Sequence, residues 1–447
     1  MSLTKNKPYI IFRIPQELRS EMEQDLRRPH SYACERVGFL FTKSKWIDQN
    51  KILIVAISYQ CVADEHYIED PTVGAKIGSE AIRSAMQTMF DMKSGCFHVH
   101  LHDHQGRPGP SATDKKGLPG VIESFANIAG GQPTGILILS KDNFFTAIKV
   151  TSNKRLYPAS LVSVVGFPMR FCFNSSRTVI QDNVFKRQSF LGPSAQWLFE
   201  NVRIGIVGYG GGGSHIGQQL AHIGVRHIAI FDGDHIEDSN LNRLIGGQRK
   251  DILKGLAKTS IARRTIKAIL PTAKVTIINS RWQDAPDMLQ QCDLIIGGID
   301  TYAERQQLEA ECRRYLIPYL DIGMDVYQSG EEPPTMSGQV MLSLPGKPCF
   351  WCYGFLSEEK LAKEAAKYGK VGGRPQVVWP NGVLASTAVG ILVELITGWT
   401  QRKDAHIYLE YDGNIGQMKD HVRIRFCDKT CSHYPLQNTG PVRFKSV

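Results

Sequence analysis

The pattern of apolar and polar positions divides the chain into two regions. In residues 1–150, amphipathic stretches that predict helices mix irregularly with apolar runs that predict strands. From residue 200 onward, short and continuous apolar runs alternate regularly with amphipathic helical stretches. Strands of this kind are buried on both faces, so the alternation predicts a parallel sheet with helices on both sides. The predicted strands of this second region are 202–210, 226–234, 274–280 and 292–300, and its first predicted helices are 214–224 and 256–270.

These two patterns predict an α/β protein with two domains. A length of 447 residues exceeds what one core usually supports. A strand-like piece at 160–174 is followed by a polar stretch, which favours a boundary there. We therefore expect an N-terminal α/β domain over 1–155, a linker or connecting strand over 156–185, and a doubly wound, mostly parallel domain over 186–447.

Composition narrows the classes of protein that fit. The chain is 42% hydrophobic with a net charge of +10, and this surplus suits an acidic protein partner or nucleic acid. Without a Lys/Arg block with interleaved aromatic residues, nucleic acid is the less favoured partner. The apolar segment 382–399 contains Glu394 and two Thr, so it predicts a buried core helix rather than a membrane span. With no apolar leader near Met1, we expect a cytoplasmic protein whose ten cysteines are thiols or metal ligands.

A glycine-rich turn follows the first strand of the second region. In "GIVGYGGGGSHIG" a strand runs into glycines and then into a helix, the arrangement that cradles phosphate groups at a helix N-terminus. Asp232 ends the next strand, at the usual distance for an acidic residue that binds ribose hydroxyls. The glycines expected to approach the nucleotide are Gly208, Gly210, Gly211 and Gly213.

The residues that follow distinguish this site from an ordinary dinucleotide site. Asn240, Asn242 and Arg243 come directly after the second strand, and Lys258 begins the next helix. Such cations suit a triphosphate, whose charge must be neutralised when an anion attacks it. Asp300 ends a later strand, where a carboxylate can hold Mg²⁺ against phosphate oxygens.

Together these stretches resemble the ThiF/MoeB family of adenylating enzymes, which activate ubiquitin-like and sulfur-carrier proteins. The resemblance covers roughly residues 180–430 and is carried by "GYGGGGS", "DGDHIEDSNLNR", "GLAK" and "GGIDTYAER". It implies a Rossmann-like fold and the use of ATP and Mg²⁺ to adenylate the C-terminal glycine of a small protein. It also implies that Asp234 belongs to the nucleotide site.

The segment "VFKRQSFLG" is similar to a part of this family that reaches into a neighbouring subunit. The resemblance implies that Arg187 acts in the partner's site and that the enzyme is a homodimer, although the first Arg of the family's pattern is absent here. Segment 355–379 contains no cysteine, whereas thioester-forming members carry one there. The sequence thus favours adenylation over covalent transfer, and a conjugating-enzyme partner remains an open alternative.

Two cysteine pairs predict a structural zinc site. Cys349 and Cys352 form a Cys-x₂-Cys pair, and Cys427 and Cys431 form a Cys-x₃-Cys pair far along the chain. This spacing is typical of a closed Cys₄ zinc site, with a redox pair or buried thiols as the alternatives.

Four histidines at every second position predict a second metal site. Strand periodicity places His98, His100, His102 and His104 on one face of the stretch "HVHLHDHQGRPGPSATD". Two of them and Asp114 would supply three ligands and leave a position for water, the pattern of catalytic zinc. The alternative is a decayed site that binds no metal.

With Glu35, this set resembles the JAMM metalloprotease family, which has a Glu followed by His-x-His-x₇-Ser-x₂-Asp. His100 and His102 are the preferred ligands, although the gap before Ser111 is one residue longer than usual; His102 and His104 are the other option. The resemblance implies that Glu35 is the general base and that Ser111 helps to hold the oxyanion. It also implies a zinc-dependent peptidase acting after the C-terminal glycines of ubiquitin-like proteins.

The predicted function combines the two halves on one partner. The ATP-dependent half adenylates a ubiquitin-like protein and the zinc-dependent half processes or deconjugates it. The alternative is a sulfur-carrier adenylyltransferase for cofactor or metabolite biosynthesis, with the peptidase half maturing the carrier. A dinucleotide-dependent oxidoreductase and a binding module with two decayed sites are less favoured.

Overall fold

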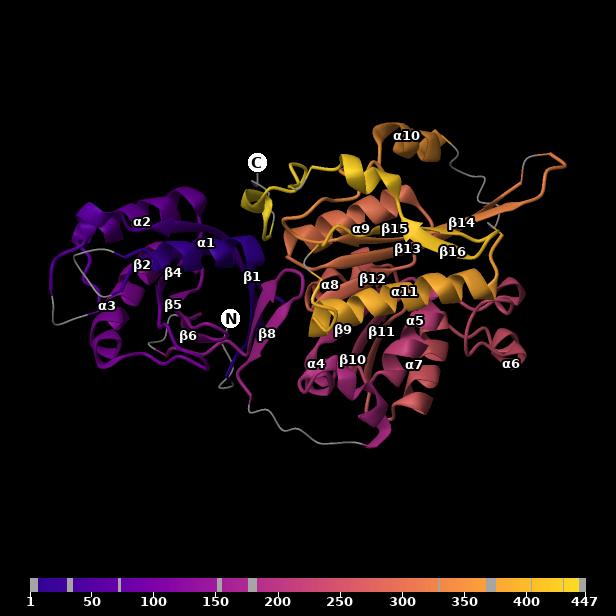
Figure 1. Cartoon of the computed structure of the whole chain (residues 1–447). Helices are drawn as coiled ribbons and strands as arrows, with labels where there is room; N and C mark the ends of the chain where they lie inside the picture. The colour runs from indigo at the N-terminus through magenta and orange to yellow at the C-terminus, as the bar shows by residue number, and fades with distance from the viewer. Residues whose placement is uncertain are drawn as a thin grey trace. The chain divides into compact units, whose positions relative to one another are not determined.

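The computed structural model describes residues 7–29, 35–70, 74–150, 155–175, 183–328, 330–366, 375–402, 404–428 and 430–441. These residues form two compact units, shown with their helices and strands in Figure 1. The first unit comprises Met1–Gly166, Arg170–Ser176 and Pro435–Val447, and the second comprises Phe167–Met169 and Arg177–Tyr434.

The first unit is built on one mixed eight-stranded sheet. The strand order is β6-β5-β4-β2-β3-β1-β7-β8, with parallel pairs β1–β3, β1–β7 and β4–β5. Its strands are β1 (Tyr9–Pro15), β2 (Val37–Trp46), β3 (Lys51–Cys61), β4 (Gly95–Leu101), β5 (Thr134–Leu139), β6 (Phe144–Lys149), β7 (Leu161–Val165) and β8 (Arg170–Phe173), and its helices are α1 (Gln16–Leu26), α2 (Ser79–Met92) and α3 (Ala112–Ile128).

Strand β4 supplies side chains to both faces of this sheet. Phe97, Val99 and Leu101 enter the core that α1 covers, whereas Cys96 enters the core that α2 and α3 cover. Because side chains alternate along a strand, His98 and His100 share the face of Cys96. The histidines are thereby directed toward α3.

The expected connecting segment 156–185 is wrong as a linker. Residues 161–165 form β7, which pairs in parallel with β1, and β8 pairs with β7 in a hairpin. Without them the apolar strand β1 would be an unpaired sheet edge, which proteins avoid. The second domain also ends before residue 447, because the segment from Pro435 packs with the first unit, where Lys43 Nζ donates to Gln437 O.

The second unit has the predicted doubly wound sheet. Strands β11, β10, β9, β12 and β13 are parallel in that order, and three antiparallel strands extend it. The strands are β9 (Arg203–Val207), β10 (His227–Phe231), β11 (Lys274–Ile278), β12 (Leu294–Gly297), β13 (Tyr319–Tyr327), β14 (Thr335–Ser343), β15 (Tyr408–Asp412) and β16 (Gln417–Asp420), and the helices are α4 (Ala195–Asn201), α5 (Gly211–His222), α6 (Arg249–Leu253), α7 (Lys258–Ile269), α8 (Pro286–Gln290), α9 (Tyr302–Arg314), α10 (Glu358–Ala366) and α11 (Val378–Thr397).

Helix α11 is the apolar segment that approached the length of a membrane span. Over the described residues it is the one helix that is long and apolar enough to cross a membrane. It packs against α5, β13 and β14, and twelve of its residues from Pro380 to Ile396 are buried. The burial of these residues explains the apolar composition of α11, as expected for a core helix.

Candidate nucleotide site and two metal-ligand clusters

The glycine-rich turn lies where the order of the second sheet reverses. Strands β9 and β12 are neighbours, and their carboxyl ends lead into α5 and α9. Gly208 has φ +86°, and a Cβ there would lie 2.6 Å from Gly298 O. A Cβ on Gly213 would lie 2.0 Å from Gly208 O. Only glycine permits this close approach of three backbone segments, at the position where doubly wound sheets bind ligands.

A cleft of about 670 Å³ opens at this edge of the sheet. It is lined by residues that follow β9, β10, β11 and β12 and by residues within β13, so several parallel strands end in it. Of the predicted nucleotide residues, the structure brings into its wall Gly208, Gly210, Gly211, Gly213, Asp232, Asp234, Asn240, Arg243, Lys258 and Asp300.

Asp232 and Lys258 are held in place by backbone and ionic contacts. The Asp232 carboxylate accepts from Tyr209 N at 2.6 Å and from Asp234 N at 2.8 Å. Burial raises the pKa of Asp232, while Lys258 and these two N–H groups oppose that shift. Lys258 Nζ lies 2.7 Å from Asp234 Oδ2, so a carboxylate keeps the ammonium group at the cleft wall.

The polar residues after β10 divide into two kinds. Asn240 is buried, and its side chain accepts from Glu237 N, so it caps a turn as well as facing the cleft. Arg243 lines the cleft and bonds to Ser239 O and to Asn242 Oδ1 at 3.1 Å. Asn242 is outside the described lining, and it donates to Gln376 O at 2.8 Å instead. Asn242 therefore tethers this segment to Gln376, and its direct contact with the nucleotide stays a prediction.

Asp300 is exposed in the cleft just before α9. Sequence reasoning missed the neighbours that shape this wall. Arg305 is buried, its Nε lies 3.1 Å from Asp321 Oδ1, and its guanidinium lies over the Phe355 ring. The position of Arg305 within "GGIDTYAER" was the available signal.

Arg187 does not lie with these residues. It is exposed on the 3₁₀ segment Asn183–Leu191 and is outside the described lining of the cleft. If Arg187 acts in a nucleotide site, that site belongs to another copy of the chain.

The cysteine cluster of the second unit contains a histidine. Ligand atoms of Cys349, Cys352, Cys431 and His433 all lie within 4.8 Å of one another. The sulfurs of Cys349 and Cys352 are 3.5 Å apart, and His433 Nδ1 lies 3.5 and 3.4 Å from them. Ligands of one tetrahedral zinc would be separated by about 3.5–3.8 Å. The expected Cys₄ set is therefore replaced by Cys₃His, with Cys427 outside the group.

Two buried residues of α9 hold the loop that carries Cys349. Glu309 accepts from Phe350 N at 2.9 Å and from Ser343 Oγ. Arg313 donates to the carbonyls of Lys347 and Pro348. These contacts fix the first cysteine pair relative to the sheet.

A second cluster joins three predicted residues of the first unit. Ligand atoms of Glu35, His100 and His102 lie within 4.8 Å of one another. Asp114 Oδ2 lies 3.4 Å from His100 Nε2 and 4.0 Å from His102 Nε2. Both ring nitrogens of buried His100 lack a hydrogen-bond partner in the described part of the chain. Because burying an unbonded polar group is costly, this arrangement fits a shared ion.

Helix α3 begins at the cluster and positions Asp114. Ser111 Oγ accepts from Asp114 N, and Ser111 N donates to Asp114 Oδ2 at 2.7 Å, which forms a capping box. Burial would raise the pKa of Asp114, but His100 and Ser111 outweigh it and hold that pKa below its usual range. Ser111 is therefore the N-cap of α3, and its oxyanion role stays a prediction.

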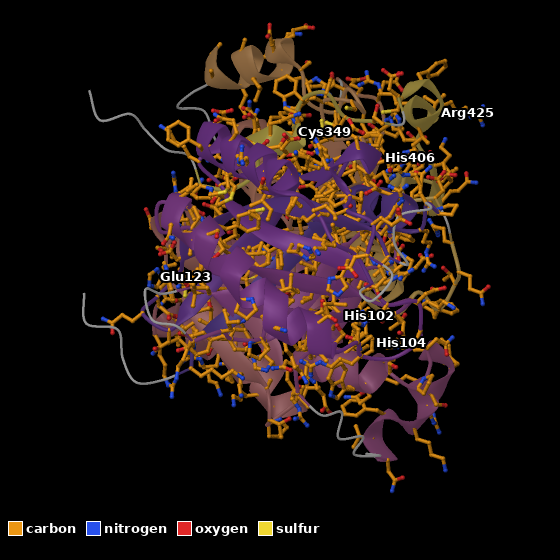
Figure 2. All side chains as sticks on the ribbon, turned by 90° about the vertical axis from the view of Figure 1, so that its left-hand side faces the viewer. His102, His104, Glu123, Cys349, His406 and Arg425 are labelled. Carbon is orange, nitrogen blue, oxygen red and sulfur yellow. The ribbon has the colours of Figure 1, made fainter. Side chains whose placement is uncertain are left out.

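The other two histidines of the run lie outside the cluster. Burial and the neighbouring His100 lower the pKa of His98 to about 3, so His98 is a neutral core residue. His104 is exposed, and its Nδ1 lies 2.8 Å from Gln105 O. Figure 2 labels His102 and His104 on the first unit. Their ring centroids are 6.2 Å apart.

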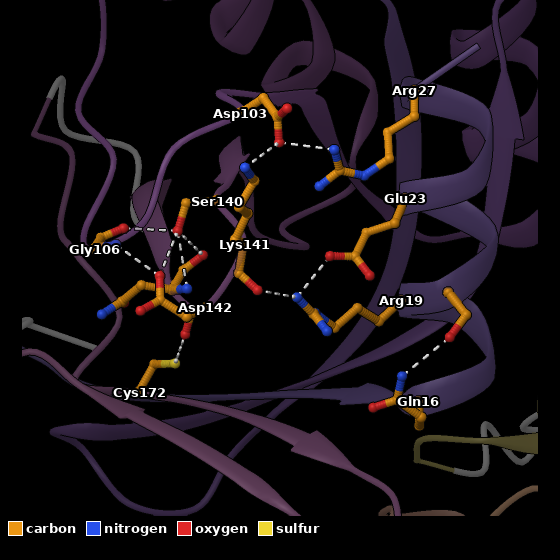
Figure 3. Close-up of polar contacts among 12 residues, drawn as sticks. Gln16, Arg19, Glu23, Arg27, Asp103, Gly106, Ser140, Lys141, Asp142 and Cys172 are labelled. Atoms are coloured by element: carbon orange, nitrogen blue, oxygen red, sulfur yellow. Dashed lines mark hydrogen bonds and ion pairs between the residues drawn. The ribbon is translucent and has the colours of Figure 1, made fainter.

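Polar contacts fix the loop between His102 and Ser111. This loop holds the residue that makes the gap between His102 and Ser111 one longer than in the JAMM pattern. Asp103 pairs with Arg27 at 2.7 Å and with Lys141 at 3.6 Å (Figure 3). Asp142 accepts from Gly106 N, and Ser140 Oγ donates to Gly106 O, both at 2.7 Å. The loop is thus anchored on α1 and on the β5–β6 turn.

The doubly wound fold, the glycine-rich turn and the cleft at the strand ends are typical of nucleotide-binding proteins. Comparison with known families gives the more specific result: residues 185–432 match the ThiF family model. The chain belongs to the ThiF family.

Individual relatives match parts of the chain. The tRNA threonylcarbamoyladenosine dehydratase of Escherichia coli (strain K12) is 33% identical over 137 residues, which are 30% of this chain and 50% of that protein. The SAMP-activating enzyme E1 of Haloferax volcanii is 25% identical over 222 residues, 49% of this chain and 75% of that protein. The chain thus spans only half the length of the first relative.

Two further comparisons are more limited. A probable molybdopterin-synthase adenylyltransferase of Porphyra purpurea is 41% identical over 108 residues, 24% of this chain and 28% of that protein. A crystal structure of E. coli MccB has a TM-score of 0.43 at 19% identity, covering 54% of this chain and 70% of that one.

Proposed function

We propose that the ThiF-family unit is an adenylyltransferase that activates the C-terminal carboxylate of a small ubiquitin-like or sulfur-carrier protein. The observation that carries this proposal is the cleft at the β9/β12 junction, which combines a phosphate-binding turn with Arg243, Lys258 and Asp300. Two relatives are named as an activating enzyme and a probable adenylyltransferase. An oxidoreductase transfers no phosphoryl group, so it has no growing phosphate charge for Arg243 and Lys258 to neutralise.

The residues of the cleft suit each part of the reaction. The N–H groups at the start of α5 donate to phosphate oxygens, and Lys258 and Arg243 neutralise the charge that grows as a carboxylate oxygen attacks the α-phosphorus. Asp300 would hold Mg²⁺, which would supply positive charge beside the departing pyrophosphate. Asp232 accepts from the ribose hydroxyls. The bond between the α-phosphorus and the oxygen that bridges to the β-phosphate breaks. The products are an acyl-adenylate and pyrophosphate.

The test is exchange of pyrophosphate into ATP, because formation of the acyl-adenylate is reversible. Labelled pyrophosphate should enter ATP only when a protein with a free C-terminal glycine is present. The absence of a cysteine from 355–379 favours an adenylate that is handed on without an enzyme thioester. Exposed Arg187 is proposed to complete the site of a second copy in a homodimer.

We further propose that the first unit is a zinc-dependent peptidase for the same class of partner. The supporting observation is the cluster of Glu35, His100 and His102, with Asp114 beside both histidines. His100, His102 and Asp114 would hold the zinc, which would acidify a bound water when present. Glu35, from the segment before β2, is placed to accept a proton beside the histidines.

The peptidase activity is tested with a form of the partner protein that carries extra residues after its C-terminal glycine. The enzyme should remove these residues. Such cleavage supports a maturation or deconjugation activity and is equally compatible with a sulfur carrier. Attack of a sulfide donor on the acyl-adenylate, with AMP as the leaving group and a C-terminal thiocarboxylate as the product, would favour the sulfur-carrier alternative over conjugation.

A further inference from the structure

Helix α10 packs on the wall of the nucleotide cleft through one of its faces. Lys360, Leu361 and Glu364 are its partly buried residues, whereas Glu358, Glu359 and Lys363 are exposed. Lys360 Nζ donates to Phe355 O at 2.7 Å and lies 5.4 Å from the centroids of the Tyr302 and Phe355 rings. Tyr302 and Phe355 both line the cleft. Helix α10 therefore contacts residues that line the nucleotide cleft.

Glu364 caps the N-terminus of α9. Its Oε1 accepts from Tyr302 N at 3.0 Å and its Oε2 from Ala303 N at 2.9 Å, across 62 and 61 residues of sequence. The next amide, Glu304 N, donates to Thr301 Oγ1 at 3.2 Å. A residue remote in sequence thus satisfies two of the N–H groups that a helix leaves free at its start.

These capped amides lie next to the residue proposed to hold Mg²⁺. Asp300 is two residues before Tyr302, and Asp300, Thr301 and Tyr302 all line the cleft. A helix N-terminus carries a partial positive charge, which opposes the binding of a cation nearby. A carboxylate on the same amides compensates that charge and fixes the backbone that carries Asp300.

We infer that Glu364 is a positioning residue for the metal step of adenylation: it orients Asp300 and makes the start of α9 compatible with Mg²⁺. This inference rests on the proposed adenylyltransferase function. It differs from a purely structural capping role, which would stabilise α9 without favouring the metal complex over free ATP. The contact also makes metal binding sensitive to the docking of α10.

The experiment compares binding of Mg·ATP with binding of ATP in EDTA, using the full chain. The variants are Glu364→Ala and the isosteric Glu364→Gln, which keeps an acceptor oxygen but loses the charge. Glu359→Ala is the matched control, since Glu359 is exposed on the same helix and pairs only locally with Lys363. Hydrogen exchange over residues 299–305 reports on the cap itself.

We expect Glu364→Ala to weaken Mg·ATP binding by about three- to tenfold, in line with charge effects at helix ends, and to leave ATP in EDTA unchanged. Exchange over 299–305 should rise in this variant, and Glu364→Gln should be intermediate. Equal loss in both nucleotide conditions, or no loss in either, would overturn the inference. A wild-type chain that binds no Mg·ATP would instead overturn the proposed function, and this inference with it.

Discussion

His100 Nε2 lies 3.4 Å from Asp114 Oδ2, a long separation for a hydrogen bond. Two nitrogen or oxygen ligands of one tetrahedral zinc ion are separated by about 3.3 Å. The pair therefore has the spacing of two ligands that face a common point. The neighbouring His102 has its Nε2 4.0 Å from the same carboxylate oxygen.

The first prediction tests whether Asp114 is a ligand of the proposed zinc ion. Asp114→Asn should keep an oxygen for Ser111 N, so α3 stays capped, but remove the anionic ligand. Zinc affinity of the first unit should fall by about a hundredfold or more, since even residues outside the ligand shell change it ten- to hundredfold. Titration with zinc measures this directly.

The matched control is Asp103→Asn, a carboxylate on the neighbouring loop that pairs with exposed Arg27. It should leave zinc affinity unchanged. Equal affinities in wild type and Asp114→Asn would exclude Asp114 as a ligand.

The second prediction separates metal binding from proton transfer. Glu35→Gln should keep the zinc and lose cleavage of a glycine-extended partner by about a hundredfold or more, because a general base contributes about that much. His102→Ala should lose zinc and cleavage together. Zinc content and cleavage of the extended fusion are measured on the same samples, and full cleavage by Glu35→Gln would contradict the assignment.

The third prediction concerns the fourth ligand of the second cluster. His433→Ala should lose the zinc of the second unit and lower the melting temperature, because a structural zinc contributes folding free energy directly. Cys427→Ala should keep that zinc, since Cys427 lies outside the group of four. Metal analysis that gives the reverse result would restore the Cys₄ set.

The fourth prediction concerns the glycine turn. Gly208→Ala places a Cβ on a residue with φ +86°, only 2.6 Å from Gly298 O. Strain of this kind costs about 1–3 kcal/mol, so the free energy of unfolding should fall by that amount. Gly210→Ala is the control substitution, because a Cβ at Gly210 would have no neighbouring atom within 4 Å. Urea unfolding compares the two, and equal stability would argue against the close approach.

Much of the second unit was predictable because its strands are continuous apolar runs between glycine-rich and polar ends. The cleft could be predicted for the same reason: parallel strands bring residues such as Asp232 and Asp300 to one edge. The three antiparallel strands β14, β15 and β16 were not recognised, because antiparallel strands near a sheet edge lack such runs.

Other features depended on contacts that spacing does not encode. Helix α3 was hidden by Gly117, Pro119 and Gly120, although the Ser111–Asp114 capping box was a usable signal. The spacing of the cysteine pairs did not indicate His433, and the Glu364 cap joins residues 62 positions apart. The strand-like piece at 160–174 was expected, but nothing local shows that β7 pairs with β1 and β8 with β7.

Pyrophosphate–ATP exchange shows most directly whether the cleft adenylates a carboxylate. The assay uses Mg·ATP and a ubiquitin-like or sulfur-carrier protein with a free C-terminal glycine, and the same protein with an amidated C-terminus. We expect exchange with the free carboxylate alone, and a loss of about a hundredfold or more in Asp300→Ala and Arg243→Ala, because these substitutions remove preorganised charge. Exchange that persists in both variants, or that occurs equally with the amidated protein, would contradict this function.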